Sequence, residues 1–361
     1  MRIVQIIDSL EAGGAERMAV NYANALAKKI EFSALVTTRK EGVLKSQIYA
    51  EVPYLFLGKK KRIDVKAVFR LRKFIKNNKV DIVHAHSSSF FIAVLVKLTF
   101  PKVKIIWHDH YGISQDLTFR KSLGLKYGSV FFKGSIAVNS SLKKWAESYL
   151  LCSKVVYFPN FISNIFQLND KIELKGIEGK RIICVANLRP QKNHKLLIEV
   201  AGVMKKKFPD WTFHLFGKDF EDDYSRGIKR HIKKLKLEEN IFFYGTIQNI
   251  SSVLKQCDIA VLTSLSEGLP LAVLEYGLHQ MPVVSTNVGE ISKIITSDRE
   301  GFLVESNNVD QFTNALIKFI ENKSHRNVVG QRLKNKIKLN FSEESITNEY
   351  ILWLNSLIYS H

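Results

Sequence analysis

The stretch TSLSEGLPLAVLEYGLHQMPVV (residues 263–284) holds two glutamates, Glu267 and Glu275, eight positions apart in an otherwise apolar run. The run DIAVLTS (258–264) before them has the composition of a buried strand. Pro270 suits the first turn of a helix. A helix that begins here has free backbone N–H groups near Leu271 and Ala272, which together with the helix dipole make an anion site suited to phosphate.

The two carboxylates would then lie on either side of that anion site. Glu275, about one turn into the helix, could accept paired hydrogen bonds from a diol such as a ribose. Glu267, on the loop, could reach a group beyond the phosphates. The spacing therefore fits a nucleotide sugar. The competing interpretation makes Glu267 a solvated loop residue and Glu275 an exposed helix position, since most charged residues are exposed.

Alternating apolar runs and amphipathic stretches continue on both sides of this segment. This alternation is typical of parallel sheets with crossover helices. In the first half we expect strands at 2–8, 33–38, 52–57, 80–86, 104–108, 135–139 and 154–158, and helices at 15–29 and 64–76. After a weakly periodic linker (163–180), we expect strands at 181–187, 211–217, 240–245, 258–264, 282–286 and 301–304, and helices at 192–207, 224–237, 249–256, 270–279 and 308–320.

The sequence thus predicts two successive Rossmann-like α/β domains, 1–162 and 181–341. A last helix follows from Ser342 over residues 342–361. Ligands of doubly wound sheets lie outside the carboxyl ends of the strands. We therefore expect two such domains, facing across a cleft, to place their functional residues in those loops.

Composition places the chain among globular proteins, with 46% hydrophobic and 24% charged residues in 361. The apolar run 90–96 is far shorter than the roughly 20 residues of a membrane span. The N-terminus lacks the features of a signal peptide. Three cysteines without metal-ligand spacing (Cys152, Cys184 and Cys257) favour reduced thiols and a cytoplasmic chain.

The formal charge of +20 is concentrated in the first half. Residues 1–160 hold 27 Lys and Arg against 11 Asp and Glu, whereas residues 161–361 hold 27 against 23. This asymmetry suggests that the first half meets an anionic surface, or else it reflects solubility alone. The segments 59–76 and 119–134 mix basic and apolar residues, and either could lie on an anionic bilayer. For 59–76 we favour a solvated helix with a core face over membrane insertion.

Histidines and acidic residues offer two candidate metal sites, and we expect neither to hold a metal. His84 and His86 are two positions apart in a strand, which we take to point them to opposite faces, and no cysteine or acidic trio joins them with His108 and His110. The acidic run 218–224 precedes a helix and is expected to supply its cap and first-turn charges.

Several segments resemble the retaining glycosyltransferases of family 4, with their Glu-x7-Glu signature. These segments are Glu267, Gly268, Pro270, Glu275, Gly277, Pro282–Val284 and Gly289, with GGAER (13–17), DIVHAHSS (81–88), WHDHYG (107–112), FPN (158–160) and ANLRPQKNHKLLIEV (186–200). The resemblance spans the whole chain. It implies a GT-B fold with an N-terminal acceptor domain, a C-terminal donor domain, and a last helix that packs back on the first domain.

The resemblance also implies roles for individual residues. It assigns Glu267 and His110 to the transferred sugar, with His108 as the fallback if the correspondence is shifted. It assigns Lys192 to the donor diphosphate. The donor site would also include Gly14, Arg189, Thr246, Ile247, Gly268, Leu269, Leu271 and Glu275, and the acceptor loop Gly13 and Glu16. The family often has arginine where this chain has Asn187, and Arg189 is the candidate substitute.

The predicted function is transfer of a sugar from a nucleoside diphosphate sugar to a hydroxyl of a lipid-linked saccharide, in cell-surface polysaccharide synthesis. We expect this without a metal or other cofactor, at the inner face of the cell membrane. One alternative is a nucleotide-sugar epimerase on the same fold. A nucleic-acid-binding protein would explain the positive charge, but no binding motif supports it. The first glycine loop lacks a full Gly-x-Gly-x-x-Gly, which disfavours a dehydrogenase.

Overall fold

A computed structural model describes residues 1–111, 117, 120, 122–162, 172–247 and 250–359. The chain divides into two compact units, Met1–Ser163 with Ser342–His361, and Asn164–Phe341. The expected linker at 163–180 falls partly outside the described residues. Nowhere in these described ranges is a helix both long and apolar enough to cross a bilayer.

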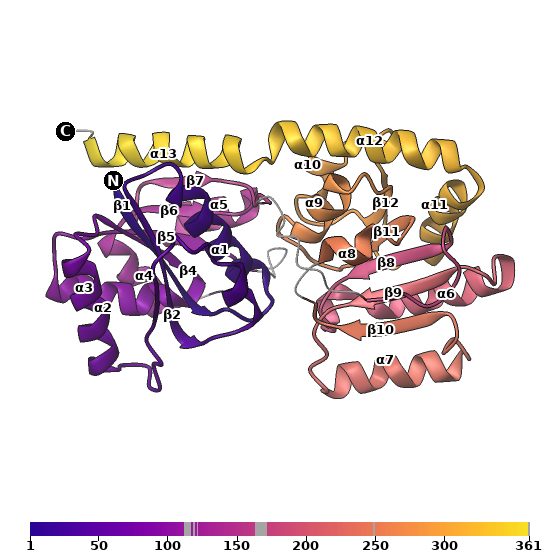
Figure 1. The fold of residues 1–361 in the computed structure, drawn as a ribbon, viewed down its shortest axis with the longest axis horizontal. Helices are drawn as coiled ribbons and strands as arrows, with labels where there is room; N and C mark the ends of the chain where they lie inside the picture. Colours follow the sequence, from indigo (N-terminus) through magenta and orange to yellow (C-terminus); the bar gives the residue numbers. More distant parts are fainter. Residues whose placement is uncertain (112–116, 118–119, 121, 163–171, 248–249, 360–361) are drawn as a thin grey trace. The chain divides into compact units, whose positions relative to one another are not determined.

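The first unit is built on a parallel seven-stranded sheet in the order β3-β2-β1-β4-β5-β6-β7 (Figure 1). All seven strands expected in this half are confirmed. Their bounds are β1 (Arg2–Ser9), β2 (Phe32–Lys40), β3 (Tyr54–Phe56), β4 (Ile82–His86), β5 (Lys104–Asp109), β6 (Phe132–Ala137) and β7 (Val155–Tyr157).

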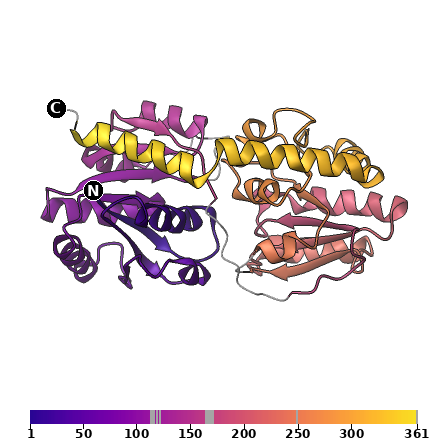
Figure 2. The same ribbon diagram turned by 45° about the horizontal axis from the view of Figure 1, so that its top comes forward.

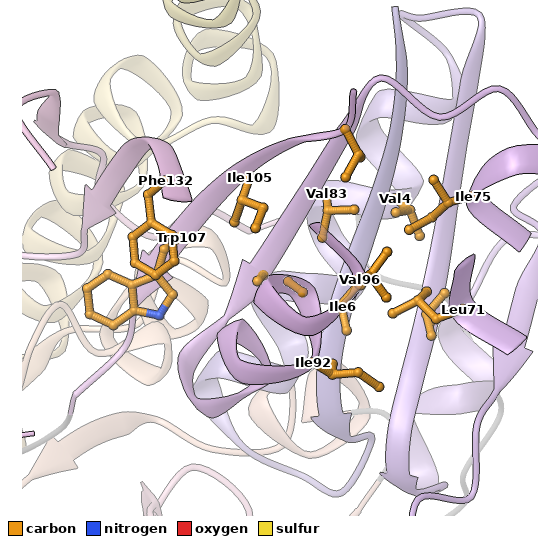
Figure 3. Close-up of a cluster of buried hydrophobic side chains, with 14 of the residues drawn as sticks. Val4, Ile6, Leu71, Ile75, Val83, Ile92, Val96, Ile105, Trp107 and Phe132 are labelled. Atoms are coloured by element: carbon orange, nitrogen blue, oxygen red, sulfur yellow. The ribbon is translucent and has the colours of Figure 1, made fainter. Parts of the chain in front are cut away.

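Apolar residues on one face of this sheet form a core with the helices α2 (Val65–Asn77) and α3 (Phe90–Thr99). Every second strand residue takes part, among them Val4, Ile6, Val83 and Trp107 (Figure 3). The core face of α2 is confirmed, because Ala67, Val68, Leu71 and Ile75 are buried. Shorter helices α4 (Leu123–Gly128) and α5 (Ser140–Tyr149) and the 3-10 turns η1 (Val43–Gln47), η2 (Ser87–Ser89) and η3 (Ser129–Phe131) complete the unit.

The opposite face of the sheet is covered by α1 (Gly14–Ala27) and by the last helix, α13 (Glu343–Tyr359). Figure 2 shows α13 running along this unit. The Lys29 ammonium, just after α1, donates to Thr347 Oγ1 at 2.7 Å and to Asn348 Oδ1 at 2.7 Å. Gly134 in β6 makes room for α13, since a Cβ there would lie 2.9 Å from Trp353 and Leu357. The predicted return of the last helix to the first domain is confirmed.

The second unit repeats the design with a parallel six-stranded sheet in the order β10-β9-β8-β11-β12-β13. Its six predicted strands are confirmed as β8 (Arg181–Val185), β9 (Thr212–Phe216), β10 (Ile241–Gly245), β11 (Ile259–Leu262), β12 (Val283–Thr286) and β13 (Phe302–Val304). Its helices are α6 (His194–Lys207), α7 (Asp223–Lys234), α8 (Ile250–Leu254), α9 (Leu271–Leu278), α10 (Ile291–Ile294), α11 (Val309–Glu321) and α12 (Lys323–Asn340), with a 3-10 turn η4 (Pro190–Lys192).

Close packing between α9 and α12 fixes the helix that carries Glu275. A Cβ on Gly277 would lie 2.1 Å from the Cδ1 atom of Ile337, and a Cβ on Gly330 would lie 2.0 Å from the carbonyl oxygen of Gln280. Both glycines therefore allow the helix α12 to approach closely. Gly277 belongs to the Glu-x7-Glu signature, and here it serves packing.

Candidate functional site

Two loops at the carboxyl ends of the adjacent strands β8 and β11 bring Lys192 and Glu267 together. The Lys192 ammonium contacts Oε1 of Glu267 at 2.5 Å, and the Ser264 hydroxyl donates to the same oxygen at 2.6 Å. The Glu267 side chain is nearly covered, at 9% exposure, and that of Lys192 is at 22%. The interpretation of Glu267 as a solvated loop residue is therefore wrong.

Hydrogen bonds between these two loops, and a tyrosine of α9, hold them in place. The Thr263 hydroxyl donates to the carbonyl of Lys192 at 3.0 Å, and the Leu265 amide donates to the carbonyl of Gln191 at 2.8 Å. The buried Tyr276 hydroxyl, from α9, accepts from the Val185 amide at 2.6 Å. Burial raises the pKa of Tyr276 well above its usual value, so the hydroxyl stays neutral. These contacts join β8, β11 and α9 into one support for the Lys192–Glu267 pair.

The turn after β12 fixes the backbone of Gly268. Gly289 has a φ of +59°, and a Cβ there would lie 2.2 Å from the carbonyl oxygen of Glu267. The next residue, Glu290, donates its amide to the Gly268 carbonyl at 2.9 Å. Position 289 therefore requires glycine, both for its left-handed backbone and for its close approach to Glu267. Tyr276 and Glu290 were not predicted, because their roles depend on contacts between distant segments. Ser264 was also not predicted, although its contact with Glu267 is local.

The helix α9 begins after Pro270 as predicted, and its first-turn residues Leu271 and Ala272 are partly exposed. Backbone N–H groups in a first turn have no partner within the helix. Leu269, just ahead of the helix, is buried. Glu275 is also buried, at 4% exposure, which rules out an exposed helix position. The first turn of α9 thus presents N–H groups without partners in the helix, directly after the loop that carries Glu267.

The other predicted donor residues lie at the same edge of this sheet. Arg189 is exposed after β8, and its guanidinium lies 4.7 Å from the centre of the Phe220 ring. The Asn187 side-chain oxygen Oδ1 accepts from the Lys218 backbone amide at 2.7 Å and so braces the turn after β9. Thr246 and Ile247 follow β10, where Gly245 has a φ of +71°.

The acidic run 218–224 covers the loop before α7 and the first two residues of that helix. Asp222 is the N-cap and accepts from the Ser225 amide at 2.9 Å. Asp223 pairs with Arg226 at 2.7 Å, and Asp219 pairs with Lys229 at 2.5 Å. The interpretation as cap and first-turn charges is confirmed for Asp222 and Asp223, whereas Asp219 lies in the loop before the helix.

In the first unit, the glycine loop after β1 leads into α1. Gly13 is the N-cap, and the Glu16 carboxylate folds back so closely that a Cβ on Gly13 would lie 2.2 Å from Oε2. The Ser9 hydroxyl donates to Glu16 Oε1 at 3.3 Å. Gly14 is exposed, and no atom lies within 4 Å of the position of a Cβ there. The loop therefore leaves open space beside Gly14, which suits the approach of a ligand.

The four histidines at the ends of β4 and β5 lie together, which overturns the expected orientation. The rings of His84 and His86 stack with centres 4.4 Å apart. Residues two apart in a strand point to the same face, so the expectation of opposite faces was wrong. His84, His86 and His108 are fully buried, whereas His110 is partly exposed. Burial lowers the pKa of His110 to about 3 and holds the pKa values of the other three well below the usual range.

Three of these histidines are close enough to share a metal ion. Ligand nitrogens of His84, His86 and His108 lie within 4.8 Å of one another. Hydrogen bonds already engage both ring nitrogens of His84 and His86. No carboxylate belongs to the group, so a divalent cation there would be buried without a balancing charge. The expectation of no metal remains a prediction.

Two family models match the chain in sequence order. The model described as Glycosyltransferase Family 4 matches residues 12–164, and the model described as Glycosyl transferases group 1 matches residues 165–336. Among solved structures, that of Anabaena HepE in complex with UDP and glucose superposes with a TM-score of 0.81 at 16% identity, over 99% of this chain and 100% of that one. At this identity the likeness shows the fold, which is GT-B.

Curated relatives match at higher identity. An Escherichia coli UDP-Gal:alpha-D-GlcNAc-diphosphoundecaprenol alpha-1,3-galactosyltransferase is 27% identical over 298 residues, which cover 77% of this chain and 76% of the relative. The Staphylococcus aureus capsular polysaccharide biosynthesis glycosyltransferase CapH is 24% identical over 305 residues, covering 81% of this chain and 83% of the relative. With both family models matched and the GT-B fold in place, the chain belongs to glycosyltransferase family 4 and is a glycosyltransferase.

Proposed function

We propose that the chain transfers a sugar, with retention of configuration, from a nucleoside diphosphate sugar to a hydroxyl of a lipid-linked saccharide in cell-surface polysaccharide synthesis. The observation that carries the proposal is the contact between Lys192 and Glu267 beside the start of α9. A cation and a helix N-terminus both favour a diphosphate, and the carboxylate beside them can accept hydrogen bonds from sugar hydroxyls.

In this proposal the donor lies at the carboxyl edge of the second unit's sheet. The diphosphate takes the Lys192 ammonium and the N–H groups near Leu271 and Ala272. Glu275 holds the ribose, and Glu267 holds hydroxyls of the sugar. Arg189 is proposed as a further phosphate contact, and the backbone of Thr246 and Ile247 as part of the base pocket. Each position follows a strand end of one sheet.

The transfer breaks the bond between the sugar's anomeric carbon and the diphosphate oxygen. The acceptor oxygen forms its bond to that carbon on the same face, and its proton passes to the departing diphosphate. Charge grows on the diphosphate as the bond breaks, so Lys192 and the α9 amides stabilise the transition state more than the ground state. No metal is required in this scheme, because these groups balance the developing charge.

The acceptor proposal is supported by the relatives. The Escherichia coli relative is named for an acceptor linked to diphosphoundecaprenol, and CapH is named for capsule synthesis. In the first unit, Gly13, Gly14 and Glu16 are proposed to form the acceptor loop. The open space beside Gly14 supports this placement.

An anionic membrane surface is the proposed partner of the first unit. Exposed apolar side chains gather on its helical face, at Ile63, Val65 and Phe69 near α2, Leu98 in α3, and Leu123, Tyr127 and Val130 near α4. The helix α2 packs beside α3, and α3 packs beside α4. The basic residues Lys60, Lys61, Arg62, Lys66, Arg70 and Lys73 lie in the same segment. Apolar side chains among cations are typical of surfaces that bind anionic lipid.

Flotation with liposomes tests this partner. The chain should float with vesicles that contain anionic lipid and remain behind with neutral ones at low salt. Phe69→Ser together with Val65→Ser should reduce flotation while the buried face of α2 stays intact. The matched control is Val328→Ser, which changes an exposed apolar residue of α12. Equal flotation with neutral and anionic vesicles would contradict the proposal.

A donor screen tests the proposed reaction. UDP-, GDP- and ADP-sugars are compared by thermal shift, and any binder is then incubated with lipid-linked saccharides for product analysis. We expect one nucleotide class to raise the melting temperature, and a glycosylated lipid to form together with free nucleoside diphosphate. Conversion of the donor to another nucleotide sugar without an acceptor would instead favour the epimerase. Absence of binding by every nucleotide sugar would remove the proposal.

A further inference from the structure

The histidine cluster of the first unit is linked by hydrogen bonds to a single buried glutamine. Gln5, in the middle of β1, is fully buried on the sheet face covered by α1 and α13. Its neighbours Val4 and Ile6 point into the apolar core on the other face. His84, His86 and His108 alternate in the same way with Val83, Ala85 and Trp107. The polar residues therefore line one face of three adjacent strands.

One set of hydrogen bonds runs from Gln5 to His110. The side-chain amide oxygen Oε1 of Gln5 lies 2.9 Å from His86 Nε2, and His86 Nδ1 lies 2.9 Å from His110 Nε2. A carbonyl oxygen only accepts, so His86 carries its proton on Nε2. The neutral ring then has an accepting Nδ1, and His110 must donate to it from Nε2–H. The remaining nitrogen of His110, Nδ1, is left with a lone pair.

A second set of contacts runs from the last helix to His108. Burial raises the pKa of Tyr350 well above its usual value, so its hydroxyl stays neutral. This hydroxyl lies 2.9 Å from His84 Nδ1, and His84 Nε2 lies 3.1 Å from His108 Nδ1. This set ends at His108 Nε2, a buried nitrogen without a partner among the described residues.

His86 and His110 therefore each carry a proton on Nε2 and a lone pair on Nδ1. All four rings are neutral because burial disfavours the charged form. Turning the Gln5 side-chain amide over would reverse the hydrogen bonds that join Gln5, His86 and His110, and His110 would then present an N–H at Nδ1. A single amide thus determines the hydrogen-bonding character of the partly exposed ring.

We propose that Gln5 and His86 are positioning residues that fix His110 as the Nε2–H tautomer, so that its Nδ1 accepts a hydrogen bond from a hydroxyl of the transferred sugar or of the acceptor. The substrate role of His110 rests on the proposed function.

Direct observation of the tautomers tests the proposal without any substrate. In the full chain labelled with ¹⁵N-histidine, long-range ¹H–¹⁵N correlation distinguishes a protonated Nε2 from a protonated Nδ1. We expect His110 and His86 to be Nε2–H at neutral pH. In Gln5→Met, which keeps the volume but removes the carbonyl, the His86 and His110 signals should shift toward a mixture of tautomers. A protonated Nδ1 on His110 in the unaltered chain would overturn the proposal.

A matched pair of variants at His86 tests the positioning role in catalysis. The Asn side chain places an amide oxygen near the position of Nδ1, so His86→Asn keeps an acceptor for His110. The Gln side chain reaches the position of Nε2, so His86→Gln keeps the contact with Gln5 and loses the acceptor. We expect kcat/KM of His86→Gln to be about tenfold below that of His86→Asn, the effect of one hydrogen bond. His86→Asn leaves the larger cavity, so a purely structural role predicts the reverse order, and that order would contradict the proposal.

Two further results separate the possible failures. If no sugar is transferred by the unaltered chain, the proposed function fails, whereas the tautomer assignment is decided by the spectra alone. Stoichiometric zinc in the purified chain, lost in His84→Asn, would overturn the proposal, because a metal would replace these hydrogen bonds.

Discussion

At the scale of single residues, the strongest prediction concerns Lys192, whose ammonium lies 2.5 Å from Glu267. Lys192→Ala should lower kcat/KM by about 10²–10³, the usual effect of removing one group that stabilises developing charge. Lys192→Arg should lower kcat/KM by less, because the positive charge remains although the geometry of the contact changes. Steady-state kinetics with the donor found in the screen provides the measurement.

The control for this prediction is Lys195→Ala. Lys195 is an exposed residue of α6 that lies 3.9 Å from Glu199. It belongs to the same segment and carries the same charge, but it is not part of the site. Similar losses in the two alanine variants would mean that general charge attracts the donor, and would contradict a specific role for Lys192.

Individual residues also show what the sequence could and could not reveal. Glu267 and Lys192 could be selected because each follows a strand end, and the structure brings them together. The shared face of His84 and His86 could have been predicted from strand periodicity and was not. The link from Gln5 to His110 could not have been predicted. It depends on the pairing of β1 with β4 and of β4 with β5, which brings residues about 80 positions apart within hydrogen-bonding distance.

At the scale of elements, the packing of α9 against α12 gives a prediction opposite to helix propensity. Gly277→Ala should reduce the free energy of unfolding by about 1–3 kcal/mol, because its Cβ would overlap Ile337. Gly227→Ala in α7 is the matched control, since no atom lies within 4 Å of its Cβ position. The free energy of unfolding of Gly227→Ala should rise by about 0.5–1 kcal/mol. Chemical denaturation checks both values, and a gain in both variants would contradict the close contact.

The elements were predicted best where burial follows a simple period. All thirteen strands were located, as were α1, α2, α6, α7, α8, α9, α11 and α13. The helices α3, α4, α5, α10 and α12 were missed. The helix α3 has an apolar composition that does not separate helix from strand by period. The helix α12 is strongly charged, and its amphipathic pattern is weak, so its position depends on packing against α9.

At the scale of the whole molecule, the buried histidines predict loss of stability in acid. Their pKa values are lowered in the folded chain, so the unfolded chain binds more protons below pH 6.5. The stability that the neutral rings contribute is complete above pH 6.5 and is lost as the pH falls below it. In that range the free energy of unfolding should fall by about 1.4 kcal/mol per pH unit for each fully buried ring.

Melting temperatures measured between pH 7.5 and 5 check this dependence. The decline should begin near pH 6.5, above the range in which the carboxylates Asp64, Asp219 and Glu300, with lowered pKa values, become protonated. A flat profile down to pH 5 would show that the rings are already accessible to protons in the folded chain.

The membership of α13 in the first unit has a consequence for how the polypeptide matures. That unit joins residues up to Ser163 with residues from Ser342 onward, about 180 positions later. A ribosome adds about 5–20 residues per second. Synthesis of Tyr350 therefore follows that of residue 163 by roughly 10–35 seconds. During that interval the surface beneath Gly134 and His84 stays uncovered, and nascent chains should bind chaperones there until synthesis ends.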